Sequence, residues 1–416
     1  MRILFLNPSG QLGGAELSLL DVMASLHDRQ PDWKLGLVAS DVGPLIDAAN
    51  ALGIETHVMP FPARLSQLGD ASLPSGRFAA TRFATTKDLA LSALPAWGYK
   101  RRLARVIRTF APDVIHTNGF KMHVLGAMAS NGRPVLWHVR DFVSTRPVMA
   151  RLLRQVAGAK TMVVANSNAV AEDVRKVLDQ GVPDKRNRVR TIHNAIDLKQ
   201  FSPDGSALDL DRLSGLPPAA QGTVRVGLVA TMAFWKGHET FLRALALLPN
   251  DFNDPNATNV RGYVIGDRIY QTSSSQHSLA ELRSLAAKLG IADRVGFTGH
   301  VSDSAAAMRS LDIVVHASTR PEPFGRVIAE AMACGRAVIT SAHGGASEII
   351  TPDADALTHE AGNERSLADG IARLAADREL RQRMSKAGLE RARTQFDRKR
   401  LADELIPIYE ELAGLN

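Results

Sequence analysis

Two glutamates, Glu322 and Glu330, lie eight positions apart on either side of an apolar segment that follows the strand-like run 312–318. Pro323 and Gly325 predict that a helix begins only after Glu322, which places Glu322 in a loop and Glu330 on the helix. The first N–H groups of a helix have no carbonyl partner within it, and they attract phosphate. A helix start flanked by two carboxylates is typical of a sugar-nucleotide site.

Side chains at other predicted strand ends could add to this chemistry. Lys236 follows the first strand of the second half of the chain, where its ammonium could neutralise a diphosphate; a surface lysine is the alternative. His138 ends the strand expected over 134–140 and could bind a sugar hydroxyl, with a buried structural histidine as the alternative. His116, which ends the run 113–117, has the same two interpretations.

A glycine-rich turn joins the first predicted strand to the first predicted helix. Gly10, Gly13 and Gly14 would let backbone approach an anion at the helix N-terminus. Their spacing differs from the G-x-G-x-x-G pattern of dinucleotide-binding enzymes. The turn by itself is therefore a weak indication of a ligand site.

No metal site is predicted. The segments 209–211 and 353–355 match the Asp-x-Asp pattern of manganese-dependent transferases, but both lie away from the phosphate candidates. We interpret their aspartates as surface caps. His and Cys residues do not have the spacing of metal ligands, and the chain contains neither a P-loop nor a nucleophile elbow.

Strands and helices must alternate along the chain to position these residues. Short β-branched or Leu-rich runs predict strands over 2–7, 34–40, 54–59, 113–117, 134–140, 161–166 and 188–193, then over 224–230, 261–265, 294–298, 312–317 and 337–341. Two such series predict an α/β protein with two doubly wound domains that face a central cleft. We expect an N-terminal domain over 1–198, a linker rich in Pro and Gly over 199–222, and a C-terminal domain over 223–395. Residues 396–416 form a final helix, which Pro407 is expected to kink or break.

The bulk composition is that of a soluble globular protein, with 45 % apolar and 22 % charged residues among 416. A single cysteine, Cys334, is consistent with a reducing cytosol. The net charge of +7 is concentrated over 64–108, where nine Lys or Arg accompany two Asp. This segment has no nucleic-acid-binding motif. It predicts either contact with an anionic membrane surface or a solvated helix face.

Taken together, these motifs resemble the retaining GT-B glycosyltransferases of glycosyltransferase family 4, also called glycosyl transferases group 1. The most specific element is Glu322-x7-Glu330 followed by 331–335. Beside it stand Gly13-Gly14-Ala15-Glu16, the segments 137–141 and 235–237, a hinge-like segment over 192–197, and Gly344-Gly345-Ala-Ser-Glu348. The resemblance covers essentially the whole chain and implies that the C-terminal helix, around 397–413, crosses back to the first domain.

The resemblance also implies roles for individual residues. Glu330 would hold the ribose hydroxyls of the nucleotide, and Glu322 would bind hydroxyls of the donor sugar. Lys236 would neutralise the leaving phosphate, and His138 would lie near the donor sugar and its anomeric centre. The implied catalytic set is Lys236, Glu322 and His138. The donor-binding set adds the loop and helix start Phe324, Gly325, Arg326 and Val327, the residue Glu330, and Gly13 with Gly14 from the first domain.

One departure from the family pattern concerns the diphosphate. The family commonly has an Arg five positions before the Lys, where this chain has Thr231. A hydroxyl cannot replace the charge of a guanidinium, so Arg326 or Arg268 is expected to supply it, or else the transition state is less stabilised.

The implied reaction is transfer of a hexose, such as glucose or N-acetylglucosamine, from a nucleoside-diphosphate sugar to a hydroxyl of a glycan or lipid-linked acceptor. The resemblance implies front-face substitution without metal and with retention of configuration. The motif set contains no candidate base or nucleophile that would suggest another mechanism. UDP-glucose or UDP-N-acetylglucosamine is the expected donor, in surface polysaccharide synthesis at the inner face of the cell membrane. The alternatives are a GDP-mannose-dependent mannosyltransferase, a related phosphorylase or epimerase, and a non-catalytic sugar-nucleotide-binding subunit.

Overall fold

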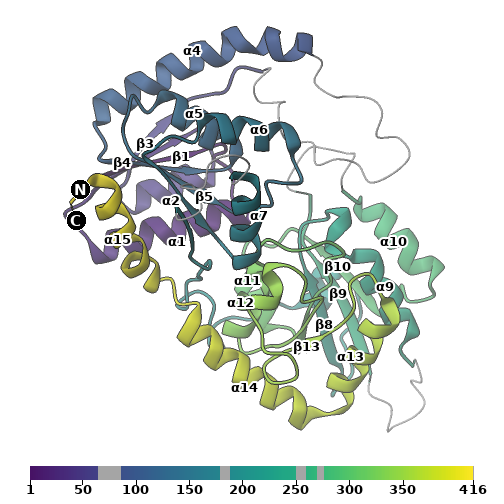
Figure 1. Cartoon of the computed structure of the whole chain (residues 1–416). Helices are drawn as coiled ribbons and strands as arrows, with labels where there is room; N and C mark the ends of the chain where they lie inside the picture. Colours follow the sequence, from purple (N-terminus) through teal and green to yellow (C-terminus); the bar gives the residue numbers. More distant parts are fainter. Residues whose placement is uncertain (64–85, 179–187, 250–258, 269–275, 416) are drawn as a thin grey trace. The chain divides into compact units, whose positions relative to one another are not determined.

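The computed structural model describes residues 1–63, 86–178, 188–249, 259–268 and 276–415 (Figure 1). The chain separates into two compact units, residues 1–194 with 398–416 and residues 195–397. Residues 199–222, for which the composition predicts a linker, lie within the second unit. Phe201 and Leu210 are buried there, because this segment contributes apolar side chains to the core of that unit.

The first unit contains a parallel sheet of seven strands in the order β3-β2-β1-β4-β5-β6-β7. Its strands are β1 Arg2–Asn7, β2 Lys34–Ala39, β3 Glu55–Val58, β4 Val114–Asn118, β5 Val135–Val139, β6 Thr161–Ala165 and β7 Val189–Thr191. The central strands are buried along their whole length, as expected for a parallel sheet covered on both faces.

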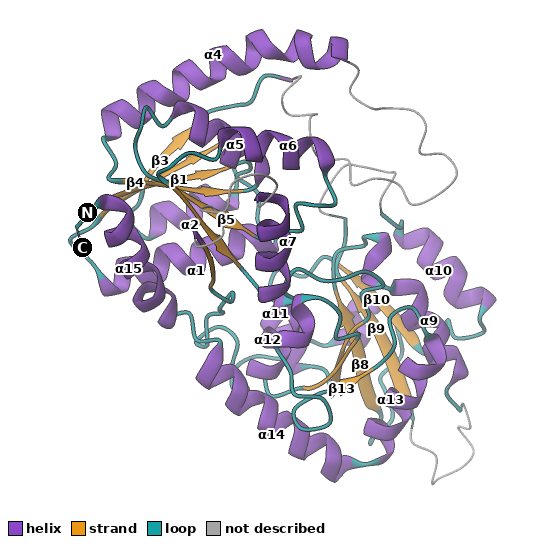
Figure 2. Cartoon of the chain, viewed as in Figure 1, coloured by secondary structure: helices purple, strands orange, loops and turns teal. Residues whose placement is uncertain are grey.

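Helices cover both faces of this sheet (Figure 2). They are α1 Gly14–Arg29, α2 Pro44–Ala51, α4 Thr86–Phe110, α5 Phe120–Ala129, α6 Pro147–Val156, α7 Asn168–Leu178 and α15 Arg400–Ala413. The last of these, α15, lies at the end of the chain but belongs to the first unit, where it packs on α1. This confirms the crossing predicted for the C-terminal helix. It is continuous through Pro407, so the expectation of a break is wrong. Burial of Leu401, Leu405 and Tyr409 offsets the hydrogen bond that proline removes.

The second unit repeats this design with a parallel sheet of six strands in the order β10-β9-β8-β11-β12-β13. Its strands are β8 Val224–Val229, β9 Val260–Ile265, β10 Val295–Gly299, β11 Ile313–His316, β12 Ala337–Thr340 and β13 Leu357–Thr358. Its helices are α8 Leu210–Ser214, α9 His238–Leu247, α10 Leu279–Lys288, α11 Ser304–Arg309, α12 Arg326–Ala333, α13 Glu364–Ala376 and α14 Arg378–Gln395, with 3-10 turns Phe234–Lys236 and Gly345–Glu348.

Both sheets have the strand order of doubly wound α/β folds, with two βαβ series running outward from a central pair. That pair is β1 and β4 in the first unit and β8 and β11 in the second. Ligands of such folds bind beyond the carboxyl ends of the strands at this switch point. The predicted fold class, two Rossmann-like domains, is confirmed.

The two Asp-x-Asp segments contain one surface aspartate and one buried aspartate each, so the interpretation of all four as surface caps is wrong. Asp209 does cap α8, by accepting from the Arg212 N–H at 3.0 Å, and Asp353 is exposed. Asp211, however, is 4 % exposed. Asp355 is also buried and pairs with Arg391 at 3.2 Å.

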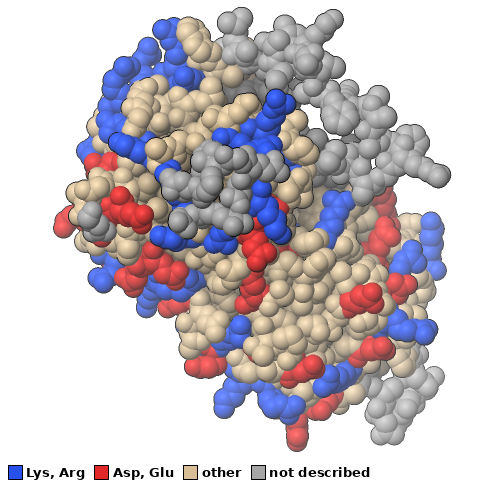
Figure 3. Space-filling model, in the orientation of Figure 1, with Lys and Arg blue, Asp and Glu red and all other residues tan. Residues whose placement is uncertain are grey.

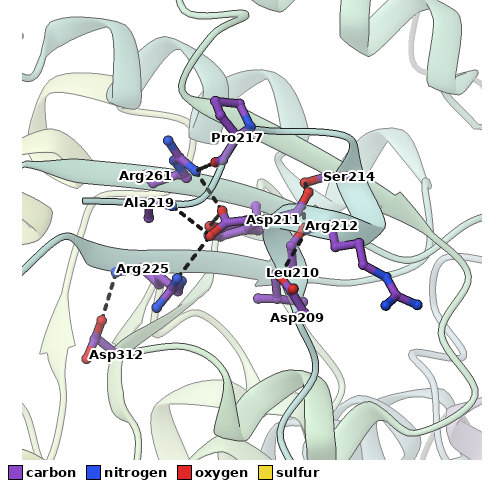
Figure 4. Close-up of polar contacts among 11 residues, drawn as sticks. Asp209, Leu210, Asp211, Arg212, Ser214, Pro217, Ala219, Arg225, Arg261 and Asp312 are labelled. Atoms are coloured by element: carbon purple, nitrogen blue, oxygen red, sulfur yellow. Dashed lines mark hydrogen bonds and ion pairs between the residues drawn. The ribbon is translucent and has the colours of Figure 1, made fainter. Parts of the chain in front are cut away.

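The Asp211 carboxylate joins α8 to the sheet of the second unit (Figure 4). It accepts from Arg261 at 2.7 Å, from Arg225 at 3.0 Å, and from the Tyr263 hydroxyl at 2.5 Å. Burial alone would raise the pKa of Asp211, but these donors hold it well below its usual range. This aspartate is therefore a structural anion with its charge already compensated.

The described residues contain no helix that combines the length and the apolar character needed to cross a membrane.

Candidate functional site

Loops at the carboxyl edge of the second sheet bring the predicted residues of that unit together. Lys236 ends the 3-10 turn Phe234–Lys236, between β8 and α9. Gly237 follows with a φ of +76°, and a Cβ atom there would lie 1.9 Å from the Ala317 carbonyl oxygen. Only glycine permits this close approach, which holds the Lys236 turn against the end of β11. The Thr319 N–H also donates to the Trp235 carbonyl at 2.8 Å.

Lys236 and Glu322 are in direct contact. The Lys236 Nζ atom lies 2.9 Å from Oε1 and 2.8 Å from Oε2 of Glu322. Their side chains are 23 % and 13 % exposed, respectively. The family resemblance implies contacts of these two residues with different parts of a donor, and the structure shows that their side chains also pair with each other.

Two further residues at the end of β11 surround the Glu322 carboxylate. The Ser318 hydroxyl donates to Oε2 at 2.7 Å, and the His316 Nε2 atom lies 3.3 Å from the same oxygen. His316 is oriented on its other side by Thr340, at 3.0 Å. Burial alone would raise the pKa of Glu322, but Lys236, supported by His316, holds it well below its usual range. Glu322 is therefore an anion at neutral pH, a hydrogen-bond acceptor rather than a proton donor.

Helix α12 begins directly beyond this carboxylate. Gly325 is its N-cap with a φ of +96°, a conformation that strongly favours glycine. The helix starts at Arg326, after Glu322 as predicted, and the Ile328 N–H of its first turn donates to the Gly325 carbonyl at 2.9 Å. Phe324 is 2 % exposed and packs into the core, while Val327 is half-buried.

The side chains of Arg326 and Glu330 pair along α12. The Arg326 Nε atom donates to the Glu330 carboxylate at 2.6 Å, and its Nη1 atom donates to the Ala195 carbonyl at 3.0 Å. In this arrangement the guanidinium is directed along α12. Arg268, the other candidate to replace the charge missing at Thr231, donates through Nε to the His277 carbonyl at 2.9 Å.

A buried polar network occupies the carboxyl edge of the first sheet. Asn118, at the end of β4, donates to Asn7 at 2.6 Å and accepts from Arg140 at 2.8 Å. Glu16 on α1 accepts from the Gly13 N–H at 3.2 Å, which fixes the turn before that helix. Burial raises the pKa of Glu16 despite these hydrogen bonds. Each strand of the switch point thus ends in a polar side chain held by its neighbours.

His138 and His116 belong to the same network. The His116 Nε2 atom lies 3.2 Å from the His138 Nδ1 atom, and His116 Nδ1 lies 2.6 Å from the Tyr409 hydroxyl on α15. Arg140 reaches His138 Nδ1 at 3.2 Å. Burial, with the nearby Arg140 charge, lowers the pKa of both histidines well below the usual range. Both are therefore neutral at pH 7.

The glycines of the first turn differ in what the fold demands of them. A Cβ atom on Gly10 would lie 2.2 Å from the Asp41 carbonyl oxygen, whereas one on Gly14 would meet no atom within 4 Å. Gly10 is therefore required by the fold. Gly14, the first residue of α1 after the N-cap Gly13, is not required by its own surroundings, which is consistent with a ligand that approaches it closely.

Sequence reasoning missed Ser318, Asn7, Asn118, Arg140 and Tyr409. Four of them lie at or just beyond strand ends, and their position directly after apolar runs could have marked them as site residues. No such sequence signal marks Tyr409, because it is 293 positions from the histidine that it contacts. Among the residues with a described position, no group of three or more His, Cys, Asp or Glu side chains could hold a metal ion.

Both halves of the chain match profiles of known glycosyltransferase families. The profile described as Glycosyltransferase Family 4 matches residues 12–200, and that described as Glycosyl transferases group 1 matches residues 218–391. A crystal structure of Anabaena HepE in complex with UDP-glucose superimposes with a TM-score of 0.78 and 25 % identity, covering 99 % of this chain and 100 % of HepE.

Two curated relatives differ in how much they align. The D-inositol 3-phosphate glycosyltransferase of Nocardioides sp. is 26 % identical over 96 % of this chain and 86 % of its own length. The lipopolysaccharide core biosynthesis glycosyltransferase LpsD of Rhizobium meliloti is 35 % identical over 31 % of this chain. The latter alignment covers 38 % of LpsD, less than two thirds of its length.

Proposed function

We propose that this chain, which belongs to glycosyltransferase family 4, transfers a hexose from a UDP-sugar to a hydroxyl of a glycan or lipid-linked acceptor with retention of configuration. The family resemblance and the enzyme class predicted from the sequence, a glycosyltransferase, are confirmed. The donor, the acceptor and the roles of individual residues are our proposals.

The observation that carries the proposal is the Lys236–Glu322 contact in front of helix α12. A lysine 2.8 Å from a partly buried carboxylate can exchange that partner for the diphosphate of a donor, while the carboxylate turns to sugar hydroxyls. In this exchange Lys236 keeps an anionic partner and Glu322 keeps hydrogen-bond donors, so neither side chain is left without a polar partner. The first N–H groups of α12, from Arg326 and Val327 with the adjacent Gly325, receive the phosphates. Glu330 receives the ribose hydroxyls.

The proposed chemistry is front-face substitution. The anomeric carbon–oxygen bond breaks as the acceptor oxygen approaches from the same face, and the leaving diphosphate oxygen accepts the acceptor's proton. Lys236 stabilises the negative charge that develops on the diphosphate, and the neutral His138 binds the donor sugar. Glu322, held as an anion, positions the sugar and transfers no proton. The protein contributes position and electrostatics, and the residues named need no metal ion.

Support for a UDP-hexose comes from Anabaena HepE, which was crystallised with UDP-glucose. The test is donor hydrolysis without acceptor, measured as nucleotide release from UDP-glucose, UDP-N-acetylglucosamine, UDP-galactose and GDP-mannose in EDTA. We expect release from one UDP-hexose, and none from that donor with Lys236→Ala. Release from GDP-mannose alone would replace the UDP-hexose proposal with a mannosyltransferase, and no release from any donor would refute the stand-alone enzyme.

The proposed acceptor is a lipopolysaccharide-type or other lipid-linked glycan, because LpsD carries that function in its name. Helix α4 offers a surface for the membrane on which such an acceptor is presented. Its buried side contains Tyr99, Leu103 and Ile107, and its outer side contains Trp97, which is 53 % exposed, with the Arg101 guanidinium 4.2 Å above its ring.

Basic side chains gather at the upper left in Figure 3, where α4 ends. Among the side chains of this helix that the structure describes, the exposed cations are Arg101, Arg102, Arg105 and Arg108. An aromatic ring among basic residues is typical of helices that lie at anionic membrane surfaces. The first part of the predicted membrane segment 64–108, residues 64–85, lies outside the described residues.

Co-sedimentation with vesicles tests the membrane proposal. We expect binding to vesicles that contain anionic lipid at low salt, weaker binding at high salt, and a further loss with Trp97→Ala or Arg101→Glu. Arg283→Glu, in the second unit, serves as the charge-matched control. Absence of binding at low salt would refute the membrane contact and leave the transferase proposal unaffected.

A further inference from the structure

The hydrogen bonds around His138 define the position of its proton. A guanidinium only donates hydrogen bonds, and Arg140 Nη2 lies 3.2 Å from the Nδ1 atom of His138. The Nδ1 atom must therefore be the acceptor, and the neutral ring carries its proton on Nε2. His138 is 1 % exposed, and burial makes a charged ring unfavourable.

The same reasoning extends to His116 and Tyr409. Because His138 Nδ1 accepts, the His116 Nε2 atom at 3.2 Å must donate to it. A neutral His116 that carries its proton on Nε2 has an unprotonated Nδ1, which accepts from the Tyr409 hydroxyl at 2.6 Å. The chain of donors thus runs in one direction, from Tyr409 through His116 to His138.

This chain ends in an unused donor. In the described structure the His138 Nε2 atom is buried and has no hydrogen-bond partner. Burying an N–H group without a partner costs about 1–3 kcal/mol. An acceptor that binds to the Nε2–H group of His138 would remove this cost. A sugar hydroxyl is such an acceptor.

We propose that Tyr409, His116 and Arg140 act as positioning residues that fix His138 as a neutral Nε2–H donor to a hydroxyl of the donor sugar. The identity of that acceptor rests on the proposed function; the proton position does not. Tyr409 belongs to α15, which packs on α1 and β4. The C-terminal helix thereby influences the proton position of His138, at the end of β5, through the single hydroxyl group of Tyr409.

Among the described residues, the charged and titratable groups that act on His138 are Arg140, His116 and His123. A cation and two rings that burial keeps neutral disfavour an imidazolium at this position. His138 should therefore show no protonation step across the ordinary pH range of histidine titration. It cannot be a general base for the acceptor, because its unprotonated nitrogen already accepts from Arg140 and His116.

Nitrogen-15 NMR of histidine-labelled full-length protein without donor tests the proton position directly, with the His138 signals assigned by their absence in His138→Gln. We expect the Nε2–H tautomer, unchanged across that pH range. A protonated Nδ1 or a charged ring at pH 7 would overturn the proposal. An inactive protein with the Nε2–H tautomer would instead refute the proposed function alone.

Tyr409→Phe removes the first donor and keeps the shape of the side chain. We expect His116 to populate both tautomers, and kcat for donor hydrolysis to fall about two- to tenfold, the usual effect of one net hydrogen bond, with KM little changed. Tyr99→Phe is the matched control, because Tyr99 is also fully buried in the first unit but its hydroxyl has no described partner. Unchanged His116 tautomers and kcat in Tyr409→Phe, or equal losses in both variants, would refute the role of Tyr409.

Discussion

Replacing Lys236 by methionine separates the structural effect of the Lys236–Glu322 pair from its role with the donor. Two unit charges 2.8 Å apart attract each other by about 6 kcal/mol at an effective dielectric constant of about 20. The net loss is smaller, because both side chains keep some exposure and Ser318 continues to donate to the carboxylate. We expect Lys236→Met to lower the free energy of unfolding at pH 7 by about 2–3 kcal/mol.

The dependence of this loss on pH follows from Glu322. In the wild type, burial of Glu322 disfavours its anionic form, but the nearby Lys236 favours that form more strongly. The pKa of Glu322 is therefore held below its ordinary value of 4.5. The Lys236–Glu322 pair therefore contributes its full stabilisation above pH 4.5, the ordinary pKa of a glutamate. This stabilisation is lost as the pH falls through the lowered pKa of Glu322. Without Lys236, burial raises the pKa, and Glu322 becomes protonated at mildly acidic pH. The difference between variant and wild type should narrow from pH 7 towards pH 5.

Urea unfolding followed by tryptophan fluorescence, with donor hydrolysis measured on the same preparations, is the assay. The double variant Lys236→Met/Glu322→Gln leaves no unpaired charge at this partly buried position, so we expect most of the stability to return while kcat stays about 100- to 1000-fold below the wild type. Lys288→Met, on the exposed face of α10, is the surface control. A double variant as unstable as the single one, or a single variant with normal kcat, would refute the reasoning.

Three other predictions concern stability and donor binding. Asp211→Asn should destabilise the protein by about 2–3 kcal/mol, because the Arg261 charge beside it would lose its partner; thermal melts check this, and an unchanged midpoint would contradict it. Gly14→Ala should leave the melting temperature unchanged, since a Cβ there meets no atom, yet raise KM for the donor; a normal KM would exclude close approach of the donor. His123 and His238 have pKa values lowered to about 3 by burial, so the unfolded state binds more protons below pH 6.5. From pH 6.5 to 5.5 each should cost about 1 kcal/mol of stability, and an urea midpoint that does not fall would disprove this.

The fold could be predicted because its signals are local. Buried parallel strands require continuous apolar runs, and the predicted strands agree with the observed ones except for β13, whose two residues, Leu357 and Thr358, are too short for a periodic signal. The start of α12 could be predicted for the same reason, since Pro323 and Gly325 act on the backbone next to them.

Contacts between distant residues could not be predicted. Lys236 and Glu322 are 86 positions apart, and their spacing carries no information about their pairing. Asp211 resembles a surface cap in sequence because its partners, Arg225 and Arg261, come from strands that only the folded sheet brings near. Tyr409 lies behind Pro407, a residue that predicts a helix break, yet packing of α15 keeps the helix continuous.

The measurement that tests the central claim most directly is calorimetric titration of the purified protein with UDP, GDP and ADP in EDTA, repeated with Glu330→Gln. If the chain is a family 4 transferase that uses UDP-sugars, we expect micromolar binding of UDP alone, without divalent metal. We also expect weaker UDP binding when Glu330 is replaced. Failure of all three nucleotides to bind, or binding that requires a divalent metal, would contradict the account.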